Sequence, residues 1–333
     1  MTALAASRTP AGTAPRRRGL GALAVIGYLV VAAEILLFSL ASPSFATPGN
    51  AATVLLQAAV PAIAGFGLAI VVITGGDDVV TGGIDLSSGP VVGLSGVVAA
   101  VAVQSGWSAP AAIGLALVVS IGFGAVNGTA VVLGLRPLLA TLATSGIVTS
   151  TVFLATDNVK VPLEDPLFVW LRSGTVLGVP APVLVLGVTA LVAGVLVGRT
   201  PWGIRSYAVG QNRTAASVAG VPVWRYVGGS YVIAGLLAGV AGILLAARLA
   251  AAVPGIGAQI LLDIILTAFL SVVFSRRLVV TIGGTLLAAV FVAALGNGFT
   301  LLGVGSQWVG AIKGILILLV LGLAAVRERG TRR

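Results

Sequence analysis

The side chains that most often carry out catalysis are missing or scattered in this chain. It contains no His and no Cys, which removes the commonest general base, the thiolate nucleophile and the usual ligands of transition metals. Only nine Asp and Glu remain for acid and base chemistry. We therefore expect no catalytic residue, no metal site and no cofactor, and a protein that is not an enzyme.

Three of the acids cluster in Gly-rich sequence: Asp77, Asp78 and Asp85 lie between Gly75 and Gly89. Carboxylates in such a cluster are able to hold Mg²⁺ against a diphosphate, so a membrane prenyltransferase is a remote alternative. That chemistry needs more carboxylates at one site than this sequence brings together, because the other acids are far apart along the chain.

Polar side chains within apolar sequence are the better candidates for function. Asp263 and Glu34 lie in or at the edge of long apolar segments, where an ionisable group is costly and usually functional. If either carries a coupling proton or sodium ion, the protein is an ion-coupled secondary transporter. We predict Asn127, Asn297 and Asp263 as residues of a polar pathway. For the two Asn the alternative is a hydrogen-bonded amide between packed helices, and for Asp263 it is a buried partner for backbone amides or an Arg.

The rest of the sequence suits a membrane. Of 333 residues, 58% are hydrophobic and 8% charged, with a mean hydropathy of +1.14, which excludes an ordinary soluble domain. A spanning helix needs about 20 apolar residues. This predicts an all-α polytopic membrane protein with ten transmembrane helices, or eight if the Gly-rich stretch 75–96 is re-entrant. The ten predicted spans are 20–41, 51–73, 88–105, 110–133, 137–156, 181–198, 226–249, 256–274, 279–302 and 308–326.

The basic residues test this layout, because Lys and Arg concentrate in cytoplasmic loops. An even number of spans places both termini on one side. If that side is the cytoplasm, fifteen of the 19 Lys and Arg lie on it, and the exceptions are Lys160, Arg172, Arg248 and Lys313. The net charge of +10 is therefore a signature of topology, and we expect no nucleic-acid partner.

The spans divide the chain into a disordered cytoplasmic tail at 1–19, a transmembrane domain at 20–326 and a cytoplasmic tail at 327–333. The outer loop 157–180 contains Trp170, which either helps to dock a soluble partner or anchors the loop at the membrane interface. The longest inner loop is 199–225.

Two similar segments indicate an internal repeat. The sequence NGTAVVLG at Asn127 to Gly134 ends the fourth span, and NGFTLLG at Asn297 to Gly303 ends the ninth. Because five spans separate them, the second copy would be inverted in the membrane. Inverted repeats of five plus five helices are common in transporters, although two Gly-rich helix ends also resemble each other by chance.

The inner loop 199–225 contains the pattern of a short helix. Asn212 is a suitable N-cap, Ala215 to Ala219 form the body, and Gly220 ends it. A small helix on the inner face is suited to engaging a cytoplasmic partner; a helix that only lies on the bilayer is the alternative.

Together with this loop, two further segments resemble the permeases of ribose-type bacterial ABC importers. They are GGIDLSSG at 82–89, with the family motif Gly83, Ile84, Asp85, Leu86 and Ser87, and GTL at Gly284 to Leu286 followed by NGFTLLGV at 297–304. The likeness runs in order from about Ala51 to Leu323. Each motif alone is weak, but their order and spacing are specific.

The resemblance implies a permease in the bacterial cytoplasmic (inner) membrane that imports a small polar solute, most commonly a sugar. The implied partners are an ATP-binding cassette subunit, an extracytoplasmic solute-binding protein, a second permease copy or paralogue, and membrane lipid. It also implies that loop 199–225 couples to the ATPase. The implied coupling residues are Ala208, Gly210, Asn212, Ala215 and Gly220.

The chain departs from the family pattern at Gln211 and Leu261, and most strongly across 271–280, where Arg276 and Arg277 stand in place of a glycine-rich turn. We expect that inner turn to be built differently. A phosphate-binding loop of the form GxxxxGK[ST] does not occur. ATP hydrolysis is therefore expected from a separate subunit, with alternating access in this chain.

Overall fold

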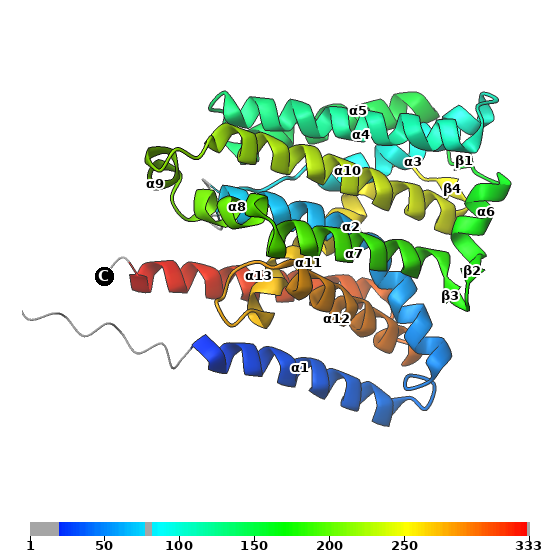
Figure 1. Cartoon of the computed structure of the whole chain (residues 1–333). Helices are drawn as coiled ribbons and strands as arrows, with labels where there is room; N and C mark the ends of the chain where they lie inside the picture. The colour runs from blue at the N-terminus through cyan, green and yellow to red at the C-terminus, as the bar shows by residue number, and fades with distance from the viewer. Residues whose placement is uncertain (1–19, 77–81, 332–333) are drawn as a thin grey trace, which may run out of the picture.

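The computed structural model describes residues 20–76 and 82–331. Figure 1 shows long helices lying side by side, as predicted for an all-α membrane protein. Each of the ten predicted spans coincides with a long helix. These are α1 (Leu20–Ala41), α2 (Pro48–Gly75), α3 (Ser88–Gln104), α4 (Ala109–Val132), α5 (Pro137–Thr156), α7 (Ala181–Arg199), α10 (Val223–Leu249), α11 (Ile256–Leu270), α12 (Ile282–Leu301) and α13 (Ser306–Thr331).

Seven of these helices are long and apolar enough to cross a bilayer by length and composition: α2, α4, α5, α7, α10, α12, and α11 with the 3-10 turn η2 (Ser271–Phe274) that continues it. The remaining three, α1, α3 and α13, contain shorter apolar helical segments. α13 continues to Thr331, past the predicted start of a C-terminal tail at 327. The predicted N-terminal tail, 1–19, lies outside the described residues.

The two longest buried helices, α2 and α10, pack against each other in the centre of the bundle. Both are apolar around their whole circumference, which is the pattern of a helix with protein on every side. In Figure 1, α4 and α5 lie on one side of this central pair, and α12 and α1 on the other.

Helix contacts follow an inverted repeat for four helices of each half. Helices α2 to α5 correspond in order to α10 to α13. The contact of α10 with α4 then matches that of α2 with α12, and the contact of α3 with α5 matches that of α11 with α13. α3 also contacts α10 and α4, as α11 contacts α2 and α12. The first helix of each half departs from this pattern, because α1 packs on η2 and α12, whereas α7 packs mainly on α2 and α8 (Pro201–Gln211).

The Gly-rich stretch 75–96 is broken only in part. α2 ends at Gly75, the chain is non-helical between residues 82 and 87, and α3 is continuous from Ser88. A side chain at Gly83 would collide with the backbone of Val71, so glycine allows the returning segment to lie directly on α2.

α3 and α11 cross where both helices begin. A Cβ atom added to Gly257 would lie 2.7 Å from the carbonyl oxygen of Gly89, and one added to Gly89 would collide with the carbonyl oxygen of Gly257. The two backbones therefore touch without a side chain between them. This is the close approach that small residues permit in membrane proteins.

One end of the bundle holds the outer loop. It contains β1 (Val161–Pro162), α6 (Pro166–Ser173) and the hairpin β2 (Thr175–Val176) with β3 (Val179–Pro180). β1 pairs with β4 (Ala251–Ala252), which ties this loop to the chain between α10 and α11. The predicted loop thus has short strands and a helix of its own. Trp170 is half-exposed on α6.

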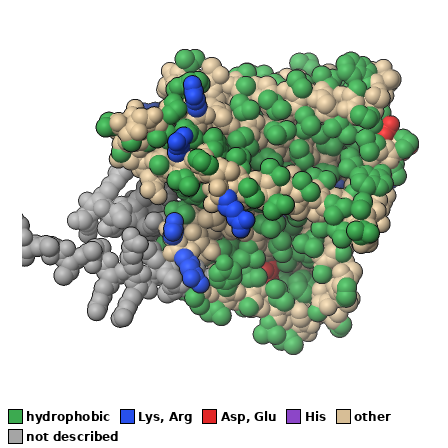
Figure 2. All heavy atoms as spheres, in the orientation of Figure 1, with side chains coloured by type: hydrophobic (Ala, Val, Ile, Leu, Met, Phe, Trp, Pro, Cys, Tyr) green, Lys and Arg blue, Asp and Glu red, His purple; other side chains and the backbone are tan. Residues whose placement is uncertain are grey.

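The opposite end holds α8, α9 (Arg213–Val218) and the turn after η2 (Figure 1). Figure 2 shows Lys and Arg side chains gathered over the part of the molecule nearer this end. The exposed arginines of the connections at this end are Arg136, Arg199, Arg205, Arg213, Arg225, Arg276 and Arg277.

Candidate functional site

The predicted coupling residues form a surface at the arginine-rich end. Ala208, Asn212, Ala215 and Gly220 are exposed on α8, α9 and the connections beside them. Val218 lies in the same surface with its side chain 86% exposed; the sequence predicts it in the body of the short helix but not among the coupling residues.

Gly210 has a different place, because it lies against the end of α2. A Cβ atom there would collide with the carbonyl oxygen of Ile73 and lie 3.4 Å from the amide nitrogen of Gly76. The guanidinium of Arg213 donates a hydrogen bond of 3.3 Å to the carbonyl oxygen of Gly75. A displacement of α8 would therefore act directly on the end of α2.

The short helix in this surface is built as predicted. The Asn212 side chain accepts a hydrogen bond of 2.8 Å from the amide of Ala215, which makes it the N-cap of α9. Ala216 is buried beneath the helix, and Gly220 follows it with φ of +80°. Gly220 thus ends the helix in the left-handed conformation that favours glycine.

α8 is also held to the turn that departs from the family pattern. The Tyr207 hydroxyl donates a hydrogen bond of 2.9 Å to the carbonyl oxygen of Val280. Burial raises the pKa of Tyr207 above its usual value, and the nearby charge of Arg277 opposes the shift. The hydroxyl consequently keeps its proton at neutral pH and stays a donor.

The altered segment 271–280 is where α1 docks. The Tyr28 hydroxyl donates to the carbonyl oxygen of Phe274 at 3.3 Å, and the two rings are in contact. Gly27 approaches Val273 closely enough that a Cβ atom would lie 2.8 Å from its side chain. The departure in sequence thus coincides with a contact surface for the first helix.

The family motif folds into a compact polar turn. The carboxylate of Asp85 accepts hydrogen bonds from the Ser87 amide at 2.9 Å and the Ser87 hydroxyl at 2.6 Å. The Ser88 hydroxyl donates to the Asp85 carbonyl oxygen at 2.8 Å. Leu86 donates its amide to the Thr141 hydroxyl of α5 at 3.2 Å. Asp85 therefore holds its own turn in shape.

Asn127 joins this turn to two helices. Its amide nitrogen donates to the Ser87 hydroxyl at 2.7 Å, and its amide oxygen accepts from the Thr144 hydroxyl at 2.6 Å. Its side chain is 1% exposed. We refer to Asp85, Ser87, Asn127 and Thr144 as the polar bracket. It connects the non-helical segment, α4 and α5.

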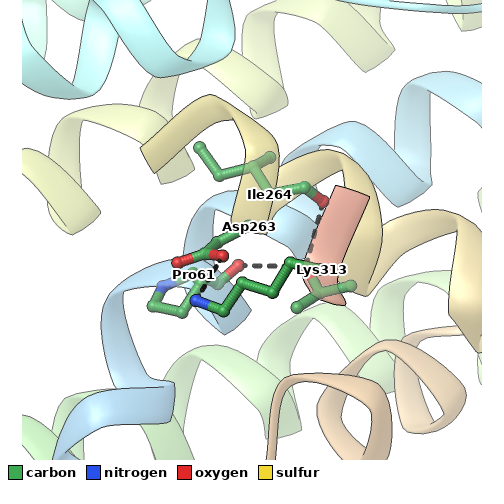
Figure 3. A network of polar contacts seen from close by, with 5 residues as sticks. Pro61, Asp263, Ile264 and Lys313 are labelled. Atoms are coloured by element: carbon green, nitrogen blue, oxygen red, sulfur yellow. Dashed lines mark hydrogen bonds and ion pairs between the residues drawn. The ribbon is translucent and has the colours of Figure 1, made fainter. Parts of the chain in front are cut away.

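The second half of the molecule has different polar groups at its core. Lys313 of α13 donates to Asp263 of α11 at 2.8 Å, an ion pair shown in Figure 3. Sequence reasoning singled out Asp263 but not Lys313. Asn297 is 6% exposed, and its amide oxygen has no hydrogen-bond partner among the described residues. The carboxylate of Glu34, in the first-half helix α1 that packs on η2 and α12, is likewise buried without a partner among the described residues.

The geometry brings some predicted residues together and leaves others apart. Asn127 and Asp85 belong to one network, whereas Asn297 and Asp263 are not joined by a hydrogen bond within the described segments. Asp77 and Asp78 lie outside the described residues. In the part that is described, no group of three acidic, His or Cys side chains is placed to hold a metal ion.

Comparison with known proteins places the chain among permeases. The profile of the family described as "Branched-chain amino acid transport system / permease component" matches residues 50–321. A ribose import permease of Bacillus subtilis is 33% identical over 297 residues, which is 86% of this chain and 87% of that protein. The ribose import permease of Escherichia coli K12 is 34% identical over 290 residues, 86% and 88% of the two chains.

A third relative is named for another sugar. The L-arabinose ABC transporter permease of Azospirillum brasilense is 29% identical over 296 residues, which is 89% of this chain and 84% of that protein.

Proposed function

Because this chain belongs to the family of ABC-importer permease components, we propose that it forms the membrane pathway through which a sugar enters the cell. The observation that carries this proposal is the likeness to ribose import permeases over nearly nine-tenths of both chains. Family membership also argues against the ion-coupled transporter and the prenyltransferase that the acidic residues allowed.

The family description names branched-chain amino acids, whereas the relatives above are named for ribose and arabinose. The identity to these relatives covers 86% to 89% of this chain, which favours a pentose or a related sugar. A neutral solute rich in hydroxyl groups needs many hydrogen bonds and no net charge in its pathway.

ATP hydrolysis comes from a separate cytoplasmic subunit in this proposal. Its docking surface is the exposed face of α8 and α9, with Ala208, Asn212, Ala215 and Gly220 as contacts. Gly210 transmits movement, because its backbone lies against the end of α2. The arginines at that end support its cytoplasmic location through the positive-inside rule, and both termini then lie in the cytoplasm.

A second permease copy or paralogue and an extracytoplasmic solute-binding protein complete the assembly. The outer loop with α6 and the β2–β3 hairpin lies on the side that would meet the binding protein. Alternating access follows if ATP-driven movement of α8 and α9 tilts α2 against the rest of the bundle.

The solute is tested with proteoliposomes containing the whole transporter purified through a tag on this chain. We expect ATP-dependent uptake of D-ribose or L-arabinose when the binding protein is present, and none of L-leucine. Uptake of L-leucine alone would overturn the sugar assignment. Uptake by this chain without any co-purified ATPase would overturn the proposal that a separate subunit hydrolyses ATP.

The coupling surface is tested by a pair of glycine substitutions at the same end of the bundle. Gly210→Ala should reduce solute-stimulated ATP hydrolysis about tenfold, because the new methyl group displaces α8 from α2. Gly198→Ala is the matched control, because a Cβ atom there meets nothing within 4 Å. Equal stimulation in both variants, at equal membrane insertion, would count against the assignment.

A further inference from the structure

The ion pair between Asp263 and Lys313 lies inside the transmembrane region. Each is the eighth residue of its helix, α11 or α13, and therefore about 10 Å along the axis from the first residue. Figure 3 shows both side chains directed toward each other in the space beside Pro61 of α2. Neither charge is at a helix end, where water would solvate it.

The pair is not sealed within the protein. The Asp263 side chain is 24% exposed and that of Lys313 is 19% exposed. An exposed surface at this depth meets lipid, another protein or water. Lipid is the least favourable, because ionised groups in the hydrocarbon region are costly and usually line a cavity or the interior of a bundle.

The pair also has hydrogen-bonding capacity left over. Within residues 20–76 and 82–331, its one polar contact is the bond of 2.8 Å between the ammonium group and a single carboxylate oxygen. An ammonium group has three donors and a carboxylate has two acceptor oxygens. Two donors and an acceptor oxygen are thus free to bind hydroxyl groups that approach from the exposed side.

We propose that the Asp263–Lys313 pair lines the translocation pathway and binds hydroxyl groups of the passing solute. This inference rests on the proposed function and adds the residues that recognise the solute. The carboxylate accepts from one hydroxyl while the ammonium group donates to its neighbour, so the pair recognises a vicinal diol without being split.

Two other polar groups in the membrane are worse placed for this role. Glu34 and Asn297 have oxygens without a partner in the part of the chain that the structure describes, but they are 8% and 6% exposed and so are enclosed by protein. Asn127 is buried, and both its amide nitrogen and its amide oxygen make hydrogen bonds in the polar bracket. Among these groups the ion pair alone combines free hydrogen-bonding capacity with access.

Water access is tested first, because it needs no assumption about the solute. The chain has no Cys, so single cysteines report one position each. Lys313→Cys in the assembled transporter should react with a charged, membrane-impermeant methanethiosulfonate about tenfold faster or more than Leu36→Cys, since the reactive thiolate forms where water reaches it. Leu36 is 61% exposed on the peripheral helix α1 and is the control for a lipid-facing side chain.

Leu266→Cys is the control for a position closed to water, since that side chain is 0% exposed. Saturating D-ribose should slow the reaction at position 313 and leave the controls unchanged. If Lys313→Cys is as slow as Leu36→Cys with and without ATP, the pair does not face the pathway and the proposal is wrong.

Solute binding is tested by exchanging the charges. The double variant Asp263→Lys with Lys313→Asp keeps an ion pair, so a purely structural role predicts normal uptake. A role in recognition predicts a half-saturating concentration of D-ribose raised about 10- to 100-fold, because hydrogen bonds to charged groups are misplaced. Normal half-saturation would overturn the proposal. If the unaltered transporter takes up no sugar, the proposed function fails instead, and the cysteine test still decides whether position 313 faces water.

Discussion

The two halves of the bundle share one helix arrangement but use polar residues in opposite ways. In the first half, Asp85, Ser87, Asn127 and Thr144 bind one another and are 5% exposed or less. In the second half, Asp263 and Lys313 form a partly exposed pair, and the Asn297 amide oxygen is unpartnered among the described residues. Closed networks rigidify, whereas open polar groups are free to bind.

This difference between closed and open polar groups suits the two halves to separate roles. The polar bracket fixes the non-helical segment that leads from the end of α2, and that end is where Gly210 and Arg213 make contact. The first half is therefore suited to passing on movement from the proposed coupling surface. The second half is suited to meeting the solute.

The largest effect on stability is expected at the crossing of α3 and α11, where one helix of each half meets the other. Gly257→Ala should lower the free energy of unfolding by about 3 kcal/mol, because the methyl group meets the backbone of Gly89 and Pro90. The measurement is reversible unfolding in detergent. Gly283→Ala, with nothing within 4 Å of its Cβ atom, should be neutral or stabilising. Equal losses in both variants would show that the crossing is looser than described.

The second-largest effect on stability is expected when the polar bracket is broken. Asn127→Leu keeps a similar volume but removes both hydrogen bonds, leaving the Thr144 and Ser87 hydroxyls short of a partner. We expect a loss of about 2 kcal/mol in the same unfolding experiment. An unchanged midpoint would mean that the bracket does not rigidify the first half.

A smaller change removes one bond of the bracket. Thr144→Val deletes the donor to the Asn127 amide oxygen and keeps the shape of the side chain. Hydrogen bonds between membrane helices average about 0.6 kcal/mol, so the unfolding free energy should fall by about that amount. A loss larger than that of Asn127→Leu would place the centre of the network at Thr144 instead.

The smallest effect is expected at the related position in the second half. Asn297→Leu removes an amide whose oxygen has no partner within the described chain, so stability should be unchanged or slightly higher. The comparison with Asn127→Leu is direct, because the chemical change is the same. Equal destabilisation by the two would erase the distinction between the halves.

Much of the fold could be predicted because span position depends on local sequence. Apolar windows located all ten long helices, and the predicted span at 137–156 coincides with α5. The N-cap at Asn212 and the helix end at Gly220 were equally local signals. The motif spacing predicted the family, since the order of short segments survives where individual residues change.

The polar contacts could not be predicted, because they join residues far apart in sequence. Lys313 is 50 positions from Asp263 and Asn127 is 40 positions from Ser87. No periodicity indicates which of several helices will bring such residues together. The contact of Gly210 with α2 was hidden for the same reason, since glycine frequency in a membrane protein does not identify the pair that touches.

The backbone crossing at Gly89 and Gly257 has a mechanical consequence. Two helix backbones that touch without side chains between them have no alternative rotamers at the contact, so this point has only one way to pack. If the bundle rocks, such a point acts as a fulcrum, and displacement grows with distance from it along each lever arm. The helix ends farthest from the crossing would then travel furthest while the crossing itself stays nearly still.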